Sequence, residues 1–272
     1  MPDHAISGWA VVLGQLAYLL SGTFPDGPLA GAALTLWMAV LGCAGATVLG
    51  VGVAVLLDQA PAPLARAIRA LLAGLRAIPV LMLIFWAYFL LPMLAGVHVG
   101  EVQTVVLALA LIGAAYTAQV MEAGFAAIGQ GQRNAALALG MTPLQALWLV
   151  VLPRTLRAML PSLGNVWVSL AKDTSLAYIV GVVELSTVAT QVNGRSVGYA
   201  AQVFAAVALL YFFICVWIES VAALLLAATR SRQRRPLWRY VTLTAFRLAR
   251  TPARPPPTSA SRGSSRSRPA PP

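Results

Sequence analysis

Apolar runs alternate along the chain with short polar or broken segments, and five of the runs are long enough to cross a membrane. A helix needs about 20 predominantly apolar residues to span the hydrocarbon core, and tilting accommodates a longer one. The five runs occupy residues 29–57, 78–94, 102–120, 159–183 and 200–228. The pattern therefore predicts an all-α membrane protein with five transmembrane helices and a transmembrane domain over residues 29–229.

The segments that flank this domain have a different character. Residues 1–28 contain one shorter apolar stretch, Trp9–Leu20. Because it is short for a span and no basic residue precedes it, we expect an interfacial helix rather than a signal peptide, with an additional span as the alternative. Residues 230–272 hold 11 of the 19 basic residues and no acidic residue. Their Arg, Pro and Ser content predicts a basic, partly disordered tail.

Composition supports a membrane protein and argues against several other classes. The chain is 59% hydrophobic and 10% charged, whereas soluble domains carry about 25% charged residues. The net charge of +11 belongs to the tail, since residues 1–229 hold 8 basic and 8 acidic residues, so no nucleic-acid partner is indicated. His4 and His98 are isolated. We therefore expect no metal site and no catalytic residues.

Basic residues in the connecting segments set the orientation of the spans, because Lys and Arg concentrate on the cytoplasmic side. Segments 58–77 and 121–158 each contain three arginines. The connecting segments on the opposite side contain a single basic residue, Arg195. With five spans, the N-terminus is predicted outside the cell, and the C-terminus and residues 122–153 in the cytoplasm.

The loop over residues 122–153 carries helix signals although it is too interrupted to span a membrane. Asn134–Leu139 is rich in Ala and Leu, which favour a helix. Gly140 follows it, where a helix commonly ends in a left-handed residue. The first half of the loop is therefore predicted to be a helix closed by a glycine turn.

A second helix is predicted immediately after this turn. Thr142 and Gln145 have the spacing of a capping box, and Pro143 suits the first helical position. We expect this helix to end at Pro153. The pattern is consistent with either an amphipathic connector on the membrane surface or a docking element for a soluble partner.

Several motifs resemble those of the permease subunits of ABC importers. The signature loop of that family reads Glu-Ala-Ala, three residues, Gly, nine residues, Ile, one residue and Leu-Pro. The same spacings are met here by Asn134-Ala135-Ala136, Gly140, Val150 and Leu152-Pro153, with Asn134 in place of the signature Glu. Four longer stretches are similar to the polar amino acid branch, and to its glutamate/aspartate-like members in particular: RAIPVLMLIFWAYFLLP (76–92), GQRNAALALGMT (131–142), VLPRTLRAMLPSLGN (151–165) and KDTSLAYIVGVVEL (172–185).

The resemblance implies a function and a set of partners. The chain would import a polar amino acid through the bacterial inner (plasma) membrane by alternating access. It would work with two ATP-binding subunits, a second permease (itself or a sister chain) and an extracytoplasmic substrate-binding protein. The loop would couple it to the ATP-binding subunits through these residues: Asn134, Ala135, Ala136, Gly140, Thr142, Pro143, Leu152 and Pro153.

The chain itself is not expected to hydrolyse ATP or to bind a cofactor. Its only lysine is Lys172, inside a predicted span, so it has no phosphate-binding loop of the form G-x-x-x-x-G-K-[ST]. An opine or a basic amino acid is an alternative substrate. A secondary transporter and a non-transporting membrane scaffold are alternatives of a different class, although no inverted repeat supports the former.

Lys172 and Asp173 lie inside the fourth predicted span, where ionisable residues are costly and usually face a bundle interior or a wet cavity. Ser162, Asn165, Ser169 and Lys172 recur at helical spacing, and Asp173 widens this polar face. A zwitterionic amino acid needs a donor for its carboxylate and an acceptor for its amino group. The face is therefore a candidate translocation path. The alternative is that Lys172 and Asp173 hold the bundle together or mark a helix break.

Overall fold

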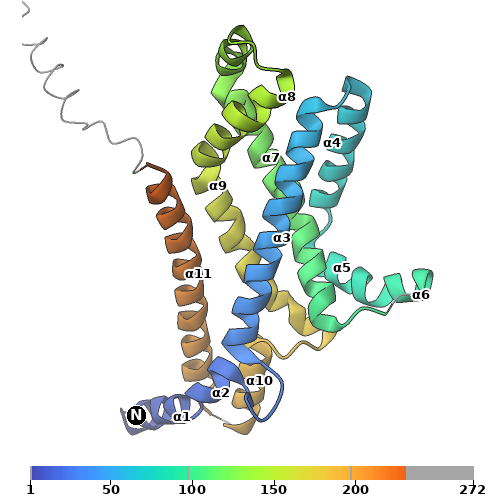
Figure 1. Cartoon of the computed structure of the whole chain (residues 1–272). Coiled ribbons are helices and arrows are strands. Elements are labelled where there is room, and N and C mark those ends of the chain that lie inside the picture. The colour runs from blue at the N-terminus through green and yellow to red at the C-terminus, as the bar shows by residue number, and fades with distance from the viewer. Residues whose placement is uncertain (1, 97, 197, 231–272) are drawn as a thin grey trace, which may run out of the picture. The chain divides into compact units, whose positions relative to one another are not determined.

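The computed structural model describes residues 2–96, 98–196 and 198–230, and most of them are helical (Figure 1). The longest helices are α3 (Gly31–Gln59), α7 (Glu101–Ala138), α9 (Leu152–Asp173) and α11 (Ala200–Arg230). The shorter elements are α1 (Pro2–Gly14), α2 (Leu16–Ser21), α4 (Ala62–Ala77), α5 (Val80–Phe85), η1 (Trp86–Leu90), α6 (Leu91–Ala95), α8 (Pro143–Ala146), η2 (Leu147–Val151), η3 (Thr174–Val180) and α10 (Leu185–Arg195). The predicted tail lies outside the described residues from residue 231 onward.

Among the described residues, four helical stretches are long and apolar enough to cross a membrane. They cover residues 31–59, 101–128, 143–180 and 200–228, and they correspond to the first, third, fourth and fifth predicted spans. The helices α3, α7, α9 and α11 run alongside one another in Figure 1, with α8 at one end and α1, α2 and α10 at the other. These ends are called the α8 end and the α10 end below.

The second predicted span, residues 78–94, is present only as one half of a bent helix pair. The helix α4 and the helical stretch Val80–Leu94 meet at 97°, so they make a fifth span only if they are counted together as one broken helix. The break lies at Ile78-Pro79, where Ile78 has an extended backbone with φ −81° and ψ 128°. A proline ring drives the preceding residue out of the helical region, and the proline nitrogen has no hydrogen to donate.

The segment expected to connect the first two spans, residues 58–77, is mostly the helix α4, which packs against α3 and α7. Ala65 of α4 is buried. The guanidinium of Arg76 donates a hydrogen bond to the carbonyl oxygen of Ala115 in α7, at 3.1 Å. Arg76 therefore belongs to the helix bundle and not to a free loop.

The helices α3 and α7 form the central pair, and small residues let their backbones approach closely. A Cβ atom added to Gly50 would lie 2.7 Å from the carbonyl oxygen of Ala114. A Cβ atom added to Gly113 would lie 2.6 Å from the Cβ atom of Ala46. Larger apolar side chains such as Leu109 fill the core beside this contact. The pair therefore forms a tightly packed axis on which the other helices are arranged.

At the α10 end, the helices α1, α2, α10 and α11 contribute to a second core. Glu184 is fully buried there and caps α10: its carboxylate accepts hydrogen bonds from the backbone N–H groups of Ser186 (2.8 Å) and Thr187 (2.9 Å). The hydroxyl of Tyr211 in α11 donates to the same carboxylate at 2.8 Å. The helix predicted over Trp9–Leu20 is confirmed as α1 and α2, while its place in a membrane interface stays a prediction.

Candidate functional site

The glycine turn predicted between two helices is present at the α8 end. The helix α7 continues without a break to Ala138, and Gly140 then adopts φ +83°. The N–H of Met141 donates to the carbonyl of Ala136 (3.2 Å), and the N–H of Gly140 donates to that of Leu137 (2.9 Å). These two bonds form a Schellman motif, which needs a left-handed residue and hence favours glycine. Residues 134–151 are called the helix–turn–helix segment below.

The predicted capping box of the second helix is also confirmed. The hydroxyl of Thr142 accepts a hydrogen bond from the backbone N–H of Gln145 at 3.3 Å. The side-chain oxygen of Gln145 accepts one in return from the backbone N–H of Thr142 at 2.9 Å. Pro143 occupies the first turn of α8, where its missing N–H costs no helical bond. The hydrogen bonds that form the turn and the start of α8 therefore all join residues close together in the sequence.

The prediction that this helix ends at Pro153 is wrong. Residues 143–180 form one continuous helical stretch that passes through Pro153. Its turn over Leu147–Val151 is π-helical, and the N–H of Leu152 bonds to the carbonyl of Leu147, five residues earlier. A widened turn of this kind accommodates an interrupted bonding pattern within a helix. The helix–turn–helix segment is thereby joined without a break to α9, in the fourth span.

The residues predicted to couple to an ATPase divide into two sets. An exposed set lies on or beside the turn: Asn134, Ala135, Gly140, Thr142 and Pro143. An inward set packs the segment onto the bundle: Ala136 and Leu152 are buried, and Pro153 is half-buried. The structure thus gathers the exposed set at one end of the molecule, while their role in coupling stays a prediction.

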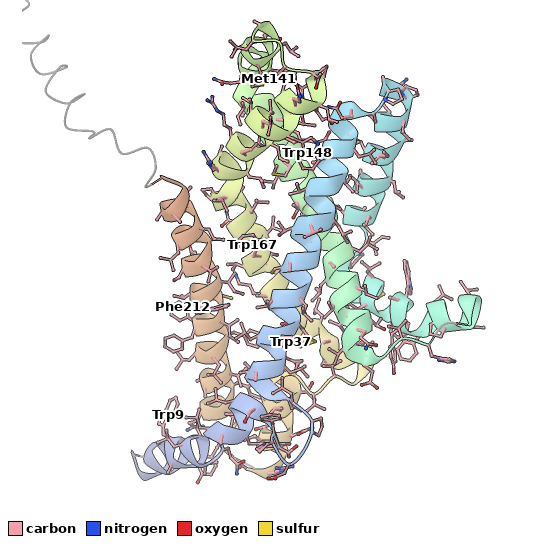
Figure 2. All side chains as sticks on the ribbon, in the orientation of Figure 1. Trp9, Trp37, Met141, Trp148, Trp167 and Phe212 are labelled. Carbon is pink, nitrogen blue, oxygen red and sulfur yellow. The ribbon has the colours of Figure 1, made fainter. Side chains whose placement is uncertain are left out.

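An apolar surface on the helix–turn–helix segment was missed in the sequence. Leu139, Leu144, Trp148 and Leu149 are exposed, and the side chain of Leu139 is 81% exposed. Figure 2 shows Trp148, together with Met141, at the α8 end. Leu144 and Trp148 are four residues apart, so helical spacing was a signal that could have identified them. Three of the four residues lie in the first turns of the stretch 143–180, at the end of that candidate span and beside the Gly140 turn. Large apolar side chains exposed at such an end are candidates for contact with a partner protein.

The polar face predicted in the fourth span lies on the open side of α9. Ser162, Asn165, Ser169 and Lys172 are exposed, and Asp173 is half-buried. The opposite side of α9 packs inward through Leu163, Gly164, Leu170 and Ala171. Asp173 ends the α-helix, and a tighter 3-10 turn follows it. The arrangement is compatible with a path lined by this face and also with the helix break considered as the alternative.

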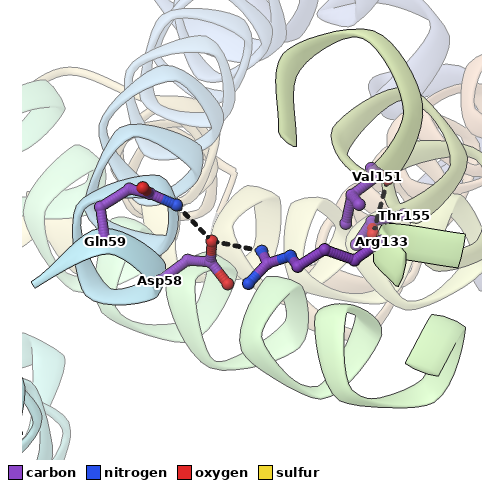
Figure 3. Close-up of polar contacts among 5 residues, drawn as sticks. All are labelled: Asp58, Gln59, Arg133, Val151 and Thr155. Carbon is purple, nitrogen blue, oxygen red and sulfur yellow. Dashed lines mark hydrogen bonds and ion pairs between the residues drawn. The ribbon is translucent and has the colours of Figure 1, made fainter. Parts of the chain in front are cut away.

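Polar contacts connect the last turns of α7 to three other helices. Arg133 pairs with Asp58 at the end of α3 (2.5 Å), and Glu122 pairs with Arg69 of α4 (2.9 Å). Arg154 of α9 donates to the side chain of Gln132. Figure 3 shows the Asp58–Arg133 contact, in which Gln59 also donates to Asp58 at 2.7 Å.

Lys172 and Asp173 take part in neither of the two ion pairs found in the described part of the chain. Within that part, no group of three or more His, Cys, Asp or Glu residues could hold a metal ion.

The sequence is similar to known transport proteins. Residues 46–231 match the family model described as "Binding-protein-dependent transport system inner membrane component". The glutamine transport system permease protein GlnP of Escherichia coli (strain K12) is 32% identical over 201 residues, which cover 70% of this chain and 87% of GlnP. The glutamate/aspartate import permease protein GltK of Escherichia coli O6:H1 is 30% identical over 213 residues, covering 76% of this chain and 91% of GltK.

Solved structures share the fold. A chain in a crystal structure of an amino acid ABC transporter with histidines is 24% identical, with a TM-score of 0.64; the match covers 72% of this chain and 91% of that one. A chain of the MetNI methionine ABC transporter in an inward-facing conformation is also 24% identical, with a TM-score of 0.60 and coverage of 71% and 93%.

Proposed function

Because this chain belongs to the binding-protein-dependent transport system inner membrane component family, we propose that it is the permease through which an ATP-driven importer moves a polar amino acid into the cytoplasm. Its relatives carry the names of glutamine and glutamate/aspartate permeases. The single observation that carries the coupling mechanism is the helix–turn–helix segment, which stands at the signature spacing and exposes an apolar surface.

The helix–turn–helix segment would dock on an ATP-binding subunit at the cytoplasmic face. Leu139, Leu144 and Trp148 supply its exposed apolar surface. Asn134, exposed where the signature has Glu, contributes no charge. Docking here would therefore depend on apolar burial and shape more than on an ion pair at this position. Gly140 would keep the turn narrow at the point of contact.

Movement of the docked segment would reach the membrane through α9. Residues 143–180 are helical throughout, so a displacement of α8 would be transmitted along one continuous helical element to Lys172 and Asp173. Closure of two ATP-binding subunits would draw two such segments together and switch the cavity between inward-open and outward-open states, a rigid-body transition. The described single chain leaves the polar face of α9 exposed, as a path shared with a second permease requires.

The substrate would meet this polar face after release from an extracytoplasmic binding protein. Lys172 would donate to the carboxylate of an amino acid, and Asp173 would accept from its amino group. In this proposal the α8 end faces the cytoplasm, and the N-terminus lies outside the inner membrane. The arginines in the early turns of α4 and α9, together with the tail, support that orientation.

The test is uptake by vesicles that contain the chain assembled with its ATP-binding subunits and supplied with the substrate-binding protein. The labelled substrates to be tested are glutamine, glutamate, aspartate, arginine and an opine. We expect uptake of at least one of them, and only when ATP is enclosed on the side of the ATP-binding subunits. Uptake without ATP would indicate a secondary transporter. An assembled complex that takes up none of the panel would contradict the proposal and favour a scaffold.

The translocation path is tested by Lys172→Ala in the same vesicles. We expect uptake to fall while the complex still assembles, because the donor for the substrate carboxylate is removed. Glu219→Gln is the matched control, since Glu219 is an exposed ionisable residue in a different span, α11. Wild-type uptake by an assembled Lys172→Ala complex would overturn the role of this face.

A further inference from the structure

The helix α7 has two parts that meet at a pair of glycines. Residues 101–128 form the apolar part that is long enough to cross a membrane. Gly129 and Gly131 follow within the same helix, and the helix–turn–helix segment begins at residue 134. Glycine weakens a helix interior because it has the largest backbone freedom to lose. The stretch between the span and the helix–turn–helix segment is therefore the intrinsically weakest part of α7.

Packing does not require glycine at the second of these positions. A Cβ atom added to Gly131 would meet no neighbouring atom within 4 Å, and its backbone is ordinary helix. This differs from Gly50 and Gly113, where a neighbouring helix occupies the space of a Cβ atom. Gly131 is therefore a site where helix stiffness can be changed without disturbing any contact.

The first side chains after this weak stretch are tied to other helices. Arg133 pairs with Asp58 of α3, and Gln132 accepts from Arg154 of α9 (Figure 3 shows the ion pair). The side chains of Arg133 and Asp58 are 25% and 13% exposed, respectively. The Arg69–Glu122 pair, before the glycines, is more exposed, at 52% and 28%. A less exposed pair is less screened by water and salt and holds its geometry more firmly.

We propose that the Asp58–Arg133 ion pair is a positioning contact that bridges the Gly129–Gly131 joint of α7 and fixes the direction of the helix–turn–helix segment relative to α3. With the pair intact, a push on α8 moves the membrane helices as one body. Without it, part of the movement is absorbed by bending α7 at the glycines. This inference rests on the proposed coupling of the segment to ATP-binding subunits and adds the residues that stiffen it.

The experiment measures substrate taken up per ATP hydrolysed in vesicles containing the full complex. Asp58→Asn and Arg133→Gln are each expected to lower this ratio by about fivefold or more, the lower end of a typical coupling between sites. The charge-swapped double variant Asp58→Arg with Arg133→Asp is expected to recover much of the ratio. Glu122→Gln is the matched control, because it breaks a pair on the same helix before the joint, and its ratio is expected to stay at the wild-type value.

A second-site variant tests the joint itself. Gly131→Ala stiffens the helix and meets open space, so adding it to Asp58→Asn is expected to restore part of the ratio. A purely stabilising ion pair predicts otherwise: uptake and ATP hydrolysis would fall together, the ratio would hold, and Gly131→Ala would not change it. That result would overturn the positioning role.

Failure of this inference is distinguishable from failure of the proposed function. If the wild-type complex shows ATP-dependent uptake and Asp58→Asn keeps the wild-type ratio, only the positioning contact is wrong. If the wild-type complex shows no ATP-dependent uptake, the proposed function is wrong and the positioning contact falls with it.

Discussion

The two ends of the bundle are held together by different kinds of contact. At the α10 end, the carboxylate of Glu184 is fully buried and accepts hydrogen bonds from two backbone N–H groups and from the hydroxyl of Tyr211. At the α8 end, Asp58–Arg133 and Arg69–Glu122 join helices through side chains that still touch solvent. Leaving a buried carboxylate without a hydrogen-bond partner costs much free energy, whereas breaking an exposed ion pair costs little because water replaces the partner. The α10 end is therefore held by buried polar bonds, whereas the α8 end, apart from the Asp58–Arg133 pair, is held by more exposed polar contacts that a partner can displace.

The largest effect on stability is expected at the α10 end. Glu184→Ala removes the acceptor for two backbone N–H groups of α10 and for the hydroxyl of Tyr211, which keeps its contact with the hydroxyl of Ser186 at 3.2 Å. It should lower the free energy of unfolding by roughly 3 kcal/mol. Thermal unfolding in detergent measures this loss. Tyr211→Phe removes one of the same bonds and should cost only about 1 kcal/mol. Equal stability of Glu184→Ala and the wild type would remove the contrast between the two ends.

At the α8 end, the largest effect is expected at Gly140. Gly140→Val forces a β-branched residue into φ +83°, which costs about 1–2 kcal/mol locally, and should abolish coupled uptake in the vesicle assay. No atom lies within 4 Å of a Cβ atom placed there, so the loss comes from backbone strain or from contact with a partner.

Gly140→Asn separates these two causes, because asparagine tolerates the left-handed region. Coupling that returns with asparagine would assign the loss to strain, whereas continued loss in an equally stable complex would assign it to close approach of the partner. Wild-type coupling in the valine variant would contradict the docking role of the turn.

A smaller effect is expected from the capping box. Thr142→Ala removes the acceptor for the N–H of Gln145 and should destabilise the start of α8 by about 1 kcal/mol. Hydrogen exchange at the amide of Gln145 should accelerate, while the exchange of α10 amides stays unchanged. Thr142→Ser keeps the hydroxyl and serves as the control. Faster exchange throughout the bundle would show that the α8 end is not an independent unit.

The smallest effect is expected from the exposed pair of α4 and α7. Glu122→Gln should change the free energy of unfolding by less than about 1 kcal/mol, since exposed ion pairs contribute little and are screened by salt. Thermal unfolding at low and high salt measures it. A loss as large as that of Glu184→Ala would mean that the α8 end is held as firmly as the α10 end.

Two prolines show how far local sequence rules extend. Pro79 breaks a helix and turns the chain by 97°, as the restriction on its preceding residue allows. Pro153 has the same chemistry but lies inside a continuous helix, because the turn before it widens and Leu147 and Val151 are buried against the bundle. The backbone restriction that a proline imposes is local, whereas packing decides whether the helix continues through it. The prediction of a helix end at Pro153 was therefore wrong, whereas the chain does bend at Pro79, at the start of the predicted second span.

The candidate site shows the same division between local and distant signals. The Gly140 turn and the Thr142 cap were predictable because every bond in them joins residues within a few positions of each other. The Asp58–Arg133 pair joins residues 75 positions apart, and it depends on the close packing of α3 against α7. Periodicity predicted the polar face of α9, but only the arrangement of the helices showed that this face is left uncovered.

The central claim is that the α8 end, through the helix–turn–helix segment, contacts the ATP-binding subunits. Photo-crosslinking from a single introduced reactive side chain in the assembled complex tests it most directly. One variant carries the crosslinker in place of Leu144, exposed on α8, and a matched variant carries it in place of Leu13, exposed on α1 at the α10 end. We predict a crosslink to the ATP-binding subunit from position 144 and none from position 13. A crosslink from position 13 with none from position 144 would contradict the account.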